Sequence, residues 1–376
     1  MKVCYLTSAL SHRDGWGRYS LKVVEGALQR GIEPVVLTSI DTGKDEPSGV
    51  ELHPILIPLF SGQNLALLRM FGAWSRVRRY AAGCDLVHCL VEPYAPLAAL
   101  SSLGRPYIIS GVGTHAVLPL EHPLKGIGFK LIYKTAAKIV CISEFTRRRI
   151  LQHVRLNNIM VIPLGVDIDS FQRASPRNCE GKDFPLIISV GALKPRKGYD
   201  ISIRAIAEAR RAIPSLRYVI IGNQDASGYV SYLRTLITEL GLDDVVSLLG
   251  QVSETELRDW YHRCDLFLLT PVQVEGAFEG FGLVYLEAAA CSKPVVGSRS
   301  GGVPDVVMDR QTGLLVREGD VEATANAIVR VLSNPDLARR LGQAGRERAK
   351  EFSWEAYAQR LEKVYQDALA RRSRRK

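Results

Sequence analysis

Two acidic residues, Glu279 and Glu287, stand at the ends of the segment EGFGLVYLE, a short distance after the apolar run LFLLT (266–270). An apolar run followed by a glycine-containing loop and a second apolar segment predicts a strand, a loop and a helix that begins near Phe281. The first N–H groups of a helix have no partner within it, and together with the helix dipole they attract anions such as phosphate. The N–H groups concerned belong to Gly280, Phe281, Gly282 and Leu283.

The two carboxylates can hydrogen-bond to the hydroxyl groups of a sugar. Glu279 and Glu287 would lie roughly 12 Å apart if the chain between them is helical. A diphosphate over the helix start would then have a sugar near Glu279 and a ribose near Glu287. Taken singly, each residue has a plainer explanation. Glu279 can be a carboxylate favoured at a helix start, and Glu287 can belong to a solvated helix face.

The elements that would position these residues alternate between apolar runs and amphipathic segments in both halves of the 376-residue chain. This alternation predicts an α/β fold with parallel sheets. Expected strands are 2–7, 34–39, 86–90, 106–110, 138–143 and 159–165, then 185–191, 216–222, 245–250, 266–270, 294–298 and 313–316. The polar stretch 167–185 between the two sets predicts a linker and two doubly wound, Rossmann-like domains facing each other across a cleft. We expect the domains at 1–170 and 171–354, with a C-terminal helix of about 355–376 packing back on the first.

The composition excludes several classes of protein. With 47% hydrophobic and 23% charged residues, it is typical of a soluble globular chain. No window offers the roughly 20 uninterrupted apolar residues of a membrane span. The N-terminus becomes polar too early for a signal peptide. Seven cysteines without a CxxC pair argue against a disulfide framework or a zinc site. A cytoplasmic location is therefore expected.

The net charge of +10 has two possible meanings. Five of the last six residues are basic, and residues 65–80 alternate arginines with Leu, Met, Phe and Trp at helical spacing. These features suit peripheral contact with an anionic membrane. A solvated chain end and an ordinary helix packed on a sheet explain them as well. No nucleic-acid-binding motif is present, so a nucleic-acid partner is not expected.

Several segments occur in an order that resembles family 4 of the retaining glycosyltransferases. They are DGWGRYSLKVVEGALQRGIEPVVLT, CISEFTRRRI, VIPLGVDIDSF, SVGALKPRKGYDISIRAI, EGFGLVYLEAAACSKPVVGS, GGVPDVV and TGLLV. The resemblance covers nearly the whole chain and implies the two-domain GT-B fold. It also implies transfer of a sugar from a UDP- or GDP-linked donor to an acceptor hydroxyl, with retention and without a metal ion or another cofactor.

The resemblance assigns roles to individual residues of the second half. Glu279 is expected near the transferred sugar and Glu287 on the nucleotide ribose. Lys197, in PRKG, matches the lysine that binds the diphosphate. The family commonly has an arginine at the position of Ala192, so Arg196 is the candidate for the second cation, although it can equally be an exposed loop residue. Val252, with Gln251 before it, falls where the family binds the nucleobase.

The first half contributes fewer candidates. Gly15 and Gly17 match the loop that approaches the phosphate. His115 follows the expected strand 106–110 and stands near the place of a family histidine, but the closest family pattern aligns that histidine with Val112. His115 can thus be catalytic or structural, and His12 is a weaker candidate. Asp305 stands where the family usually has Glu, and its role is open.

We therefore expect a hexosyltransferase in glycan, lipopolysaccharide or glycolipid synthesis. A membrane-proximal acceptor, such as a lipid-linked glycan, is favoured over a soluble one. Two alternatives remain at this point: a nucleotide-sugar epimerase of the same architecture, and a non-catalytic nucleotide-sugar-binding protein.

Overall fold

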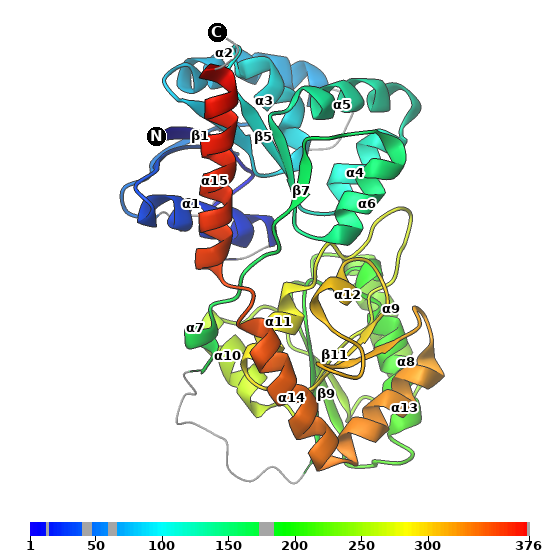
Figure 1. The fold of residues 1–376 in the computed structure, drawn as a ribbon. Helices are drawn as coiled ribbons and strands as arrows, with labels where there is room; N and C mark the ends of the chain where they lie inside the picture. Colours follow the sequence, from blue (N-terminus) through cyan, green and yellow to red (C-terminus); the bar gives the residue numbers. More distant parts are fainter. Residues whose placement is uncertain (13–14, 40–46, 59–65, 173–183, 374–376) are drawn as a thin grey trace. The chain divides into compact units, whose positions relative to one another are not determined.

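The computed structural model describes residues 1–12, 15–39, 47–58, 66–172 and 184–373. The chain divides into two compact units, each built on its own parallel sheet (Figure 1). Unit 1 comprises Met1–Pro163 and Trp354–Lys376, and unit 2 comprises Leu164–Ser353. The boundary lies a few residues before the expected one, and residues 173–183 of the polar stretch lie outside the described residues. The expected α/β class with two doubly wound units is confirmed.

Unit 1 contains a sheet in the order β3-β2-β1-β4-β5-β6-β7, with every neighbouring pair parallel. Its strands are β1 (Lys2–Leu6), β2 (Glu33–Ser39), β3 (Glu51–Leu56), β4 (Leu86–Cys89), β5 (Tyr107–Gly111), β6 (Lys138–Cys141) and β7 (Ile159–Val161). Its helices are α1 (Gly15–Gln29), α2 (Ala66–Ala82), η1 (Glu92–Tyr94), α3 (Ala95–Ser101), α4 (Thr114–Glu121), α5 (Pro123–Thr135), α6 (Glu144–His153) and α15 (Trp354–Ser373). The central strands are rich in Val, Ile and Leu because helices cover both faces of the sheet (Figure 1).

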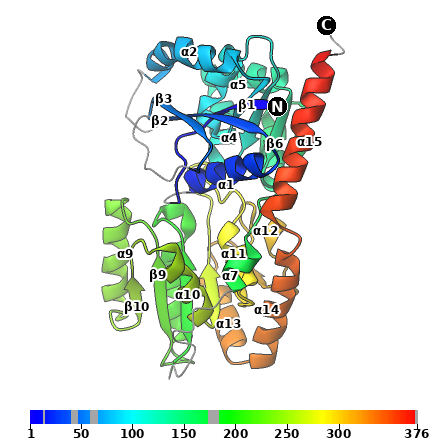
Figure 2. The ribbon, with the colours of Figure 1, turned by 90° about the vertical axis from the view of Figure 1, so that its left-hand side faces the viewer.

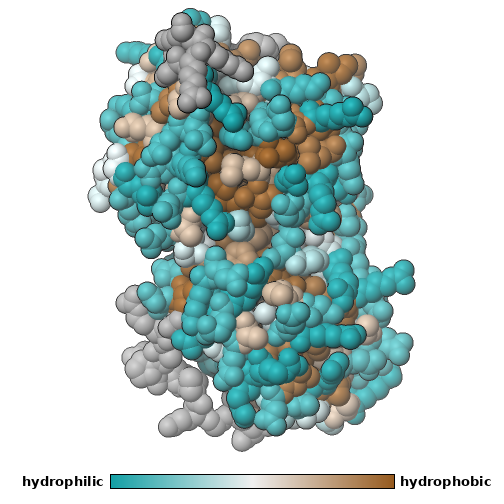
Figure 3. Space-filling model, in the orientation of Figure 1, coloured by the Kyte–Doolittle hydropathy of each residue, from teal (hydrophilic) through white to brown (hydrophobic). Residues whose placement is uncertain are grey.

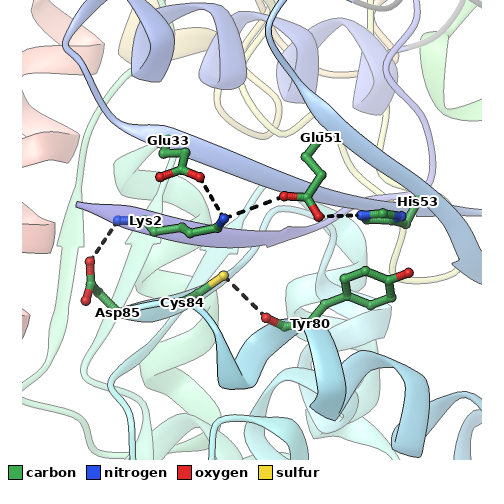
Figure 4. A network of polar contacts seen from close by, with 7 residues as sticks. All are labelled: Lys2, Glu33, Glu51, His53, Tyr80, Cys84 and Asp85. Carbon is green, nitrogen blue, oxygen red and sulfur yellow. Dashed lines mark hydrogen bonds and ion pairs between the residues drawn. The ribbon is translucent and has the colours of Figure 1, made fainter.

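Strand β3 was missed by the sequence analysis. Its sequence ELHPIL contains a proline, and Leu56 is the one buried residue of the strand, which is typical of an edge strand. An ion pair at the amino end of the sheet connects β3 to β1 (Figure 4). Lys2 lies 2.6 Å from Glu33 of β2 and 3.6 Å from Glu51 of β3, and Glu51 lies 2.8 Å from His53. These side-chain contacts are solvent-exposed and therefore weak. The backbone pairing of β3 with β2 contributes more to the stability of β3 in the sheet.

The C-terminal helix α15 packs against α1, and Figure 2 shows the two side by side. Its docking face carries two buried tyrosines. Tyr357 shares a 2.7 Å hydrogen bond with Tyr19 of α1, and Tyr365 shares one of 2.7 Å with Nδ1 of His88. The Ser110 hydroxyl connects these two hydrogen bonds into one buried network, because it contacts both the Tyr19 hydroxyl and His88 Nε2. Because its polar groups find partners inside unit 1, α15 is an integral part of that unit.

Unit 2 contains a parallel sheet in the order β10-β9-β8-β11-β12-β13. Its strands are β8 (Leu186–Val190), β9 (Arg217–Ile221), β10 (Val246–Leu248), β11 (Leu266–Leu269), β12 (Val295–Ser298) and β13 (Leu314–Val316). Its helices are α7 (Ile168–Gln172), η2 (Pro195–Lys197), α8 (Tyr199–Ala209), α9 (Ser227–Glu239), α10 (Glu254–Arg263), α11 (Leu283–Ala290), α12 (Val303–Val306), α13 (Val321–Leu332) and α14 (Pro335–Ala349).

The strand order of unit 2 reverses between β8 and β11. In open α/β sheets, the loops that leave the carboxyl ends of two such strands diverge and leave room for a ligand. The loops after β8 and β11 carry Lys197 and Glu279, so the topology brings two of the expected site residues to one sheet edge.

Two further findings concern the described residues of both units. None of the described helices combines the length and the apolar character that crossing a bilayer requires. The six cysteines that the structure describes are buried, and none of them forms a disulfide bond.

Candidate functional site

Three charged side chains of unit 2 form a cluster. Lys197 Nζ and Arg196 Nη1 each lie 2.7 Å from the same oxygen of Glu279, Oε2. The side chains of Lys197 and Glu279 are buried, with 9% and 11% of their surface exposed, whereas Arg196 is 29% exposed. The cluster thus carries two positive charges and one negative charge at the carboxyl edge of the sheet. Arg196 is therefore not the exposed loop residue that the sequence left as an alternative.

The cluster shifts the ionisation of its members. Burial disfavours the charged form of Glu279, but the positive charges of Lys197 and Arg196 outweigh it and lower the pKa of Glu279 to about 2. Burial lowers the pKa of Lys197, and the neighbouring Glu279 opposes that shift. The carboxylate is therefore ionised at neutral pH, and its charge favours the protonated form of the buried lysine.

The position of Lys197 depends on a close approach to the backbone. The lysine ends the short η2 turn, and its side chain runs back over Gly191 at the end of β8. A Cβ atom at Gly191 would lie 3.2 Å from Lys197 Cε, and the residue has a φ of 145°, which disfavours a side chain. The glycine that follows the strand therefore makes the space in which the ammonium group reaches Glu279.

The loops that carry the cluster are connected through the backbone. Val272, after β11, donates its N–H to the carbonyl oxygen of Arg196 at 2.9 Å. On the other side, Gly302 donates to the carbonyl oxygen of Glu279 at 2.8 Å. A Cβ atom at Gly301 would lie 2.2 Å from that same oxygen, so only glycine permits this contact. The sequence analysis noted GGVPDVV as a motif but did not predict that its two glycines hold the Glu279 loop.

Helix α11 begins later than the sequence predicted. Gly282 is its N-cap and Leu283 its first residue, so Gly280 and Phe281 belong to the preceding loop. In this loop, Glu279 and Gly280 pack against the backbone of Gly301 and Gly302. The estimate of 12 Å between the carboxylates assumed continuous helix and does not apply. Only Leu283 of the four expected N–H donors lies in the first turn of α11.

Glu287 lies on the inner face of α11. Its side chain is buried, with 3% of the residue exposed, and Tyr261 of α10 donates its hydroxyl hydrogen to Oε2 at 2.8 Å. The alternative of a solvated helix face is therefore wrong. A buried carboxylate needs such partners because desolvation is costly.

The remaining candidates of unit 2 occupy nearby loops. Val252 is half-buried between β10 and α10, just before Ser253, which caps α10. This loop leaves the same sheet edge as those of Lys197 and Glu279. Asp305 lies in the first turn of α12, the helix that begins directly after Gly301 and Gly302.

Unit 1 brings its own candidates together. Gly15 begins α1, Gly17 is buried in its first turn, and Trp16 between them contacts His115, with 4.9 Å between the ring centroids. His115 is the second residue of α4 and is half-buried. His12 is half-buried between β1 and α1. The start of α1, after β1, and the start of α4, after β5, therefore meet at the carboxyl edge of this sheet.

Glu92 is a buried carboxylate that the sequence analysis missed. It lies in η1 after β4, and its Oε1 accepts the N–H groups of Val112 at 2.5 Å and Gly113 at 3.1 Å. These two residues form the turn into α4 that carries His115. The other oxygen, Oε2, is buried and has no hydrogen-bond partner among the described residues. Burial raises the pKa of Glu92 to about 7, so the group titrates near neutral pH. In the sequence, Glu92 belongs to none of the motifs quoted above.

Metal ligands do not gather in the part of the chain that the structure describes, since no group of three His, Cys, Asp or Glu side chains is placed to hold an ion. The positive charges near Glu279 come from Lys197 and Arg196 instead.

Comparison with known families and proteins identifies the chain. The family model described as "Glycosyltransferase Family 4" matches residues 13–170, and the one described as "Glycosyl transferases group 1" matches residues 170–348. The chain belongs to glycosyltransferase family 4. It is a glycosyltransferase, as the sequence motifs implied, and nothing in the comparisons favours the epimerase or the non-catalytic protein.

Two relatives illustrate the range of this family. The chain is 32% identical to a GDP-mannose-dependent alpha-(1-6)-phosphatidylinositol monomannoside mannosyltransferase of Mycolicibacterium smegmatis over 302 residues, which cover 76% of this chain and 78% of the relative. It is 36% identical to a D-inositol 3-phosphate glycosyltransferase of Segniliparus rotundus over 371 residues, covering 91% and 82%. The relatives differ in acceptor, so membership in the family does not by itself define the acceptor of this glycosyltransferase.

A solved structure supports the fold. HepE of Anabaena, in complex with UDP and glucose, superposes with a TM-score of 0.82 at 20% identity, covering 97% of this chain and 99% of that one. The glycosyltransferase therefore has the GT-B fold, as the resemblance implied.

Proposed function

We propose that this glycosyltransferase transfers a hexose from a nucleoside diphosphate sugar to an acceptor hydroxyl, with retention at the anomeric carbon and without a metal ion. The cluster of Lys197, Arg196 and Glu279 is the observation that supports this proposal. It has a net charge of +1 and lies where the strand order of unit 2 reverses. A diphosphate leaving group needs positive charge fixed in advance at that kind of position.

Each member of the cluster has a role in this reaction. Lys197 and Arg196 stabilise the negative charge that develops on the departing diphosphate, and N–H groups at the start of α11 add to this field. Glu279 holds both cations through Oε2, so its Oε1 can accept a hydrogen bond from a sugar hydroxyl. Glu287 binds the ribose hydroxyls, and Val252 contacts the base.

Retention follows from attack on the face that the leaving group occupies. The bond between the anomeric carbon and the phosphate oxygen breaks, and a bond to the acceptor oxygen forms. The proton of the acceptor hydroxyl passes to an oxygen of the departing diphosphate. No second carboxylate is needed as a nucleophile in this scheme, unlike the carboxylate pair of retaining hydrolases.

Unit 1 supplies the acceptor side of the reaction in this proposal. Gly15 and Gly17 leave space for phosphate, and His115 contacts the donor sugar. We place the acceptor among membrane-proximal molecules, such as a lipid-linked glycan, and the enzyme in the cytoplasm with peripheral contact to the membrane. The relative that acts on a phosphatidylinositol mannoside supports a lipid-linked acceptor.

A thermal-shift screen tests the donor class. GDP-mannose, UDP-glucose and ADP-glucose are added separately, and we expect a UDP- or GDP-sugar to raise the Tm by several degrees. The product of a reaction with that donor is then examined by proton NMR, in which retention predicts the same anomeric configuration as in the donor. A product of inverted configuration, or an epimer formed from the donor alone, would contradict the proposal.

A further inference from the structure

Helix α5 presents an apolar stripe to solvent. Leu124 is 80% exposed, Ile127 70% and Leu131 63%, which makes them the most exposed large apolar residues that the structure describes. They are three and four residues apart, so they lie on one face of the helix. Figure 3 shows apolar surface, drawn brown, beside hydrophilic surface in the region where Figure 1 places α5.

The stripe lies between positive charges. Helix α5 carries Lys125, Lys130 and Lys134 and contains no acidic residue. At about 100° per residue, Lys130 and Lys134 lie on one side of the stripe and Lys125 on the other. Lys125 and Lys134 are exposed, and Lys130 is half-buried.

The opposite face of α5 anchors the helix to unit 1. Tyr133 is buried and donates its hydroxyl hydrogen to the carbonyl oxygen of Ala116 in α4 at 3.0 Å. Asn158 donates to the carbonyl oxygens of Tyr133 and Ala136 at the end of the helix. Gly126 packs so closely on α4 that a Cβ atom there would lie 2.8 Å from the carbonyl oxygen of Leu120. The fold is therefore complete without the outward face, and burial within unit 1 does not explain its apolar residues.

We propose that the outward face of α5 docks on an anionic lipid bilayer. A narrow apolar stripe bordered by lysines is the pattern of a helix that lies in the membrane interface, with its apolar side chains among the acyl chains and its cations at the headgroups. Anionic lipids complement the three lysines and the absence of acidic residues. A protein partner with an acidic rim would need a groove for the stripe, and a second copy would place the lysines against one another.

This surface differs from the one that the sequence favoured. In helix α2, which covers most of residues 65–80, Ala73, Val77 and Ala81 are buried and so belong to the core of unit 1. The side chains of residues 66–71 and the basic residues 374–376 lie outside the described ones. The argument for α5 rests on exposed side chains and is independent of the donor site.

Co-sedimentation with vesicles tests the proposal. The full-length protein is mixed with vesicles of equal parts phosphatidylglycerol and phosphatidylcholine, or of phosphatidylcholine alone. We expect binding to the anionic vesicles that weakens with salt. Leu124→Ser combined with Ile127→Ser should weaken binding about tenfold or more. Lys125→Gln combined with Lys134→Gln should weaken it about thirtyfold, at roughly fivefold per lysine.

Leu100→Ser is the matched control, because Leu100 is 51% exposed on α3 of the same unit. It should bind vesicles as the unaltered protein does. All variants should keep their Tm and their rate of donor hydrolysis in the absence of acceptor, which separates this proposal from the donor chemistry. Equal vesicle binding by the α5 variants would place the membrane contact elsewhere and overturn the proposal. A dimer that the Leu124 and Ile127 substitutions dissociate, without vesicle binding, would assign the face to self-association and overturn it too.

Discussion

The two cations that contact Glu279 allow a graded test of the proposed chemistry. Replacing Lys197 by Ala removes the more buried cation and reduces the net charge of the cluster from +1 to zero. Replacing Arg196 by Ala has the same formal effect on charge, but Arg196 is 29% exposed, against 9% for Lys197. Solvent screens the more exposed group, so we expect Lys197→Ala to be the more damaging change.

The magnitude follows from the electrostatics of the site. The fall in the pKa of Glu279 from 4.5 to about 2 means that its surroundings favour the ionised over the neutral form by about 3 kcal/mol. The first of the charges responsible is that of Lys197. A field of that strength matches the cost of removing one preorganised donor from an oxyanion site, about 10²–10³ in kcat. We therefore expect that loss for Lys197→Ala and about tenfold for Arg196→Ala.

Initial rates with the donor identified by the thermal-shift screen give kcat and KM for each variant. Lys350→Ala is the matched control, because Lys350 also lies 2.7 Å from a glutamate, Glu347, but is 51% exposed at the end of α14. It should leave kcat unchanged. A folded Lys197→Ala variant with turnover within threefold of the unaltered enzyme would refute the electrostatic argument. A greater loss of kcat for Arg196→Ala than for Lys197→Ala would refute the argument that the more buried cation stabilises the leaving group more strongly.

Three further outcomes are expected. Gly15→Val should keep the Tm of the unaltered protein, since a Cβ atom at Gly15 meets nothing within 4 Å. Its activity should fall at least about tenfold, because the side chain obstructs phosphate binding. A lower Tm would show that Gly15 is structural. Because burial raises the pKa of Glu92 to about 7, its contribution to the free energy of unfolding is greatest below pH 4.5 and falls by about 3 kcal/mol as the pH rises to 7. Urea unfolding of Glu92→Gln should lack that fall, and parallel pH profiles for the two proteins would contradict it. EDTA should leave transfer intact, whereas complete loss reversed by magnesium or manganese would contradict metal independence.

Much of the fold could be predicted because it depends on local patterns. Short runs of Val, Ile and Leu without alternation indicate strands covered on both faces, and the predicted runs correspond to every described strand except β3. The missed strand is short of apolar residues and contains Pro54, so its signal was indistinguishable from that of a loop. Its place in the sheet depends on pairing with β2, which is a long-range interaction.

The candidate site, like the fold, could be predicted from the sequence only in part. Residue types and their spacing made Glu279 and Glu287 candidates, because carboxylates accept hydrogen bonds from sugar hydroxyls. The resemblance to family 4 added Lys197, Gly15 and His115. The sequence did not determine which cation meets which carboxylate. The contact of Lys197 and Arg196 with one oxygen of Glu279 depends on backbone hydrogen bonds between loops that are far apart in the chain.

The sequence by itself thus determined the class of fold, the parallel strands and a set of candidate groups for binding an activated sugar. Only the tertiary structure decided that Glu92 is buried beneath the turn that carries His115, that Glu287 faces Tyr261, and that Leu124 faces solvent. The physical reason is that strand and helix periodicity is encoded in neighbouring residues, whereas burial and the pairing of charges depend on which distant segments pack together. A leucine at a given place in a helix can lie in the core or face solvent, depending on which distant segment packs against that side of the helix.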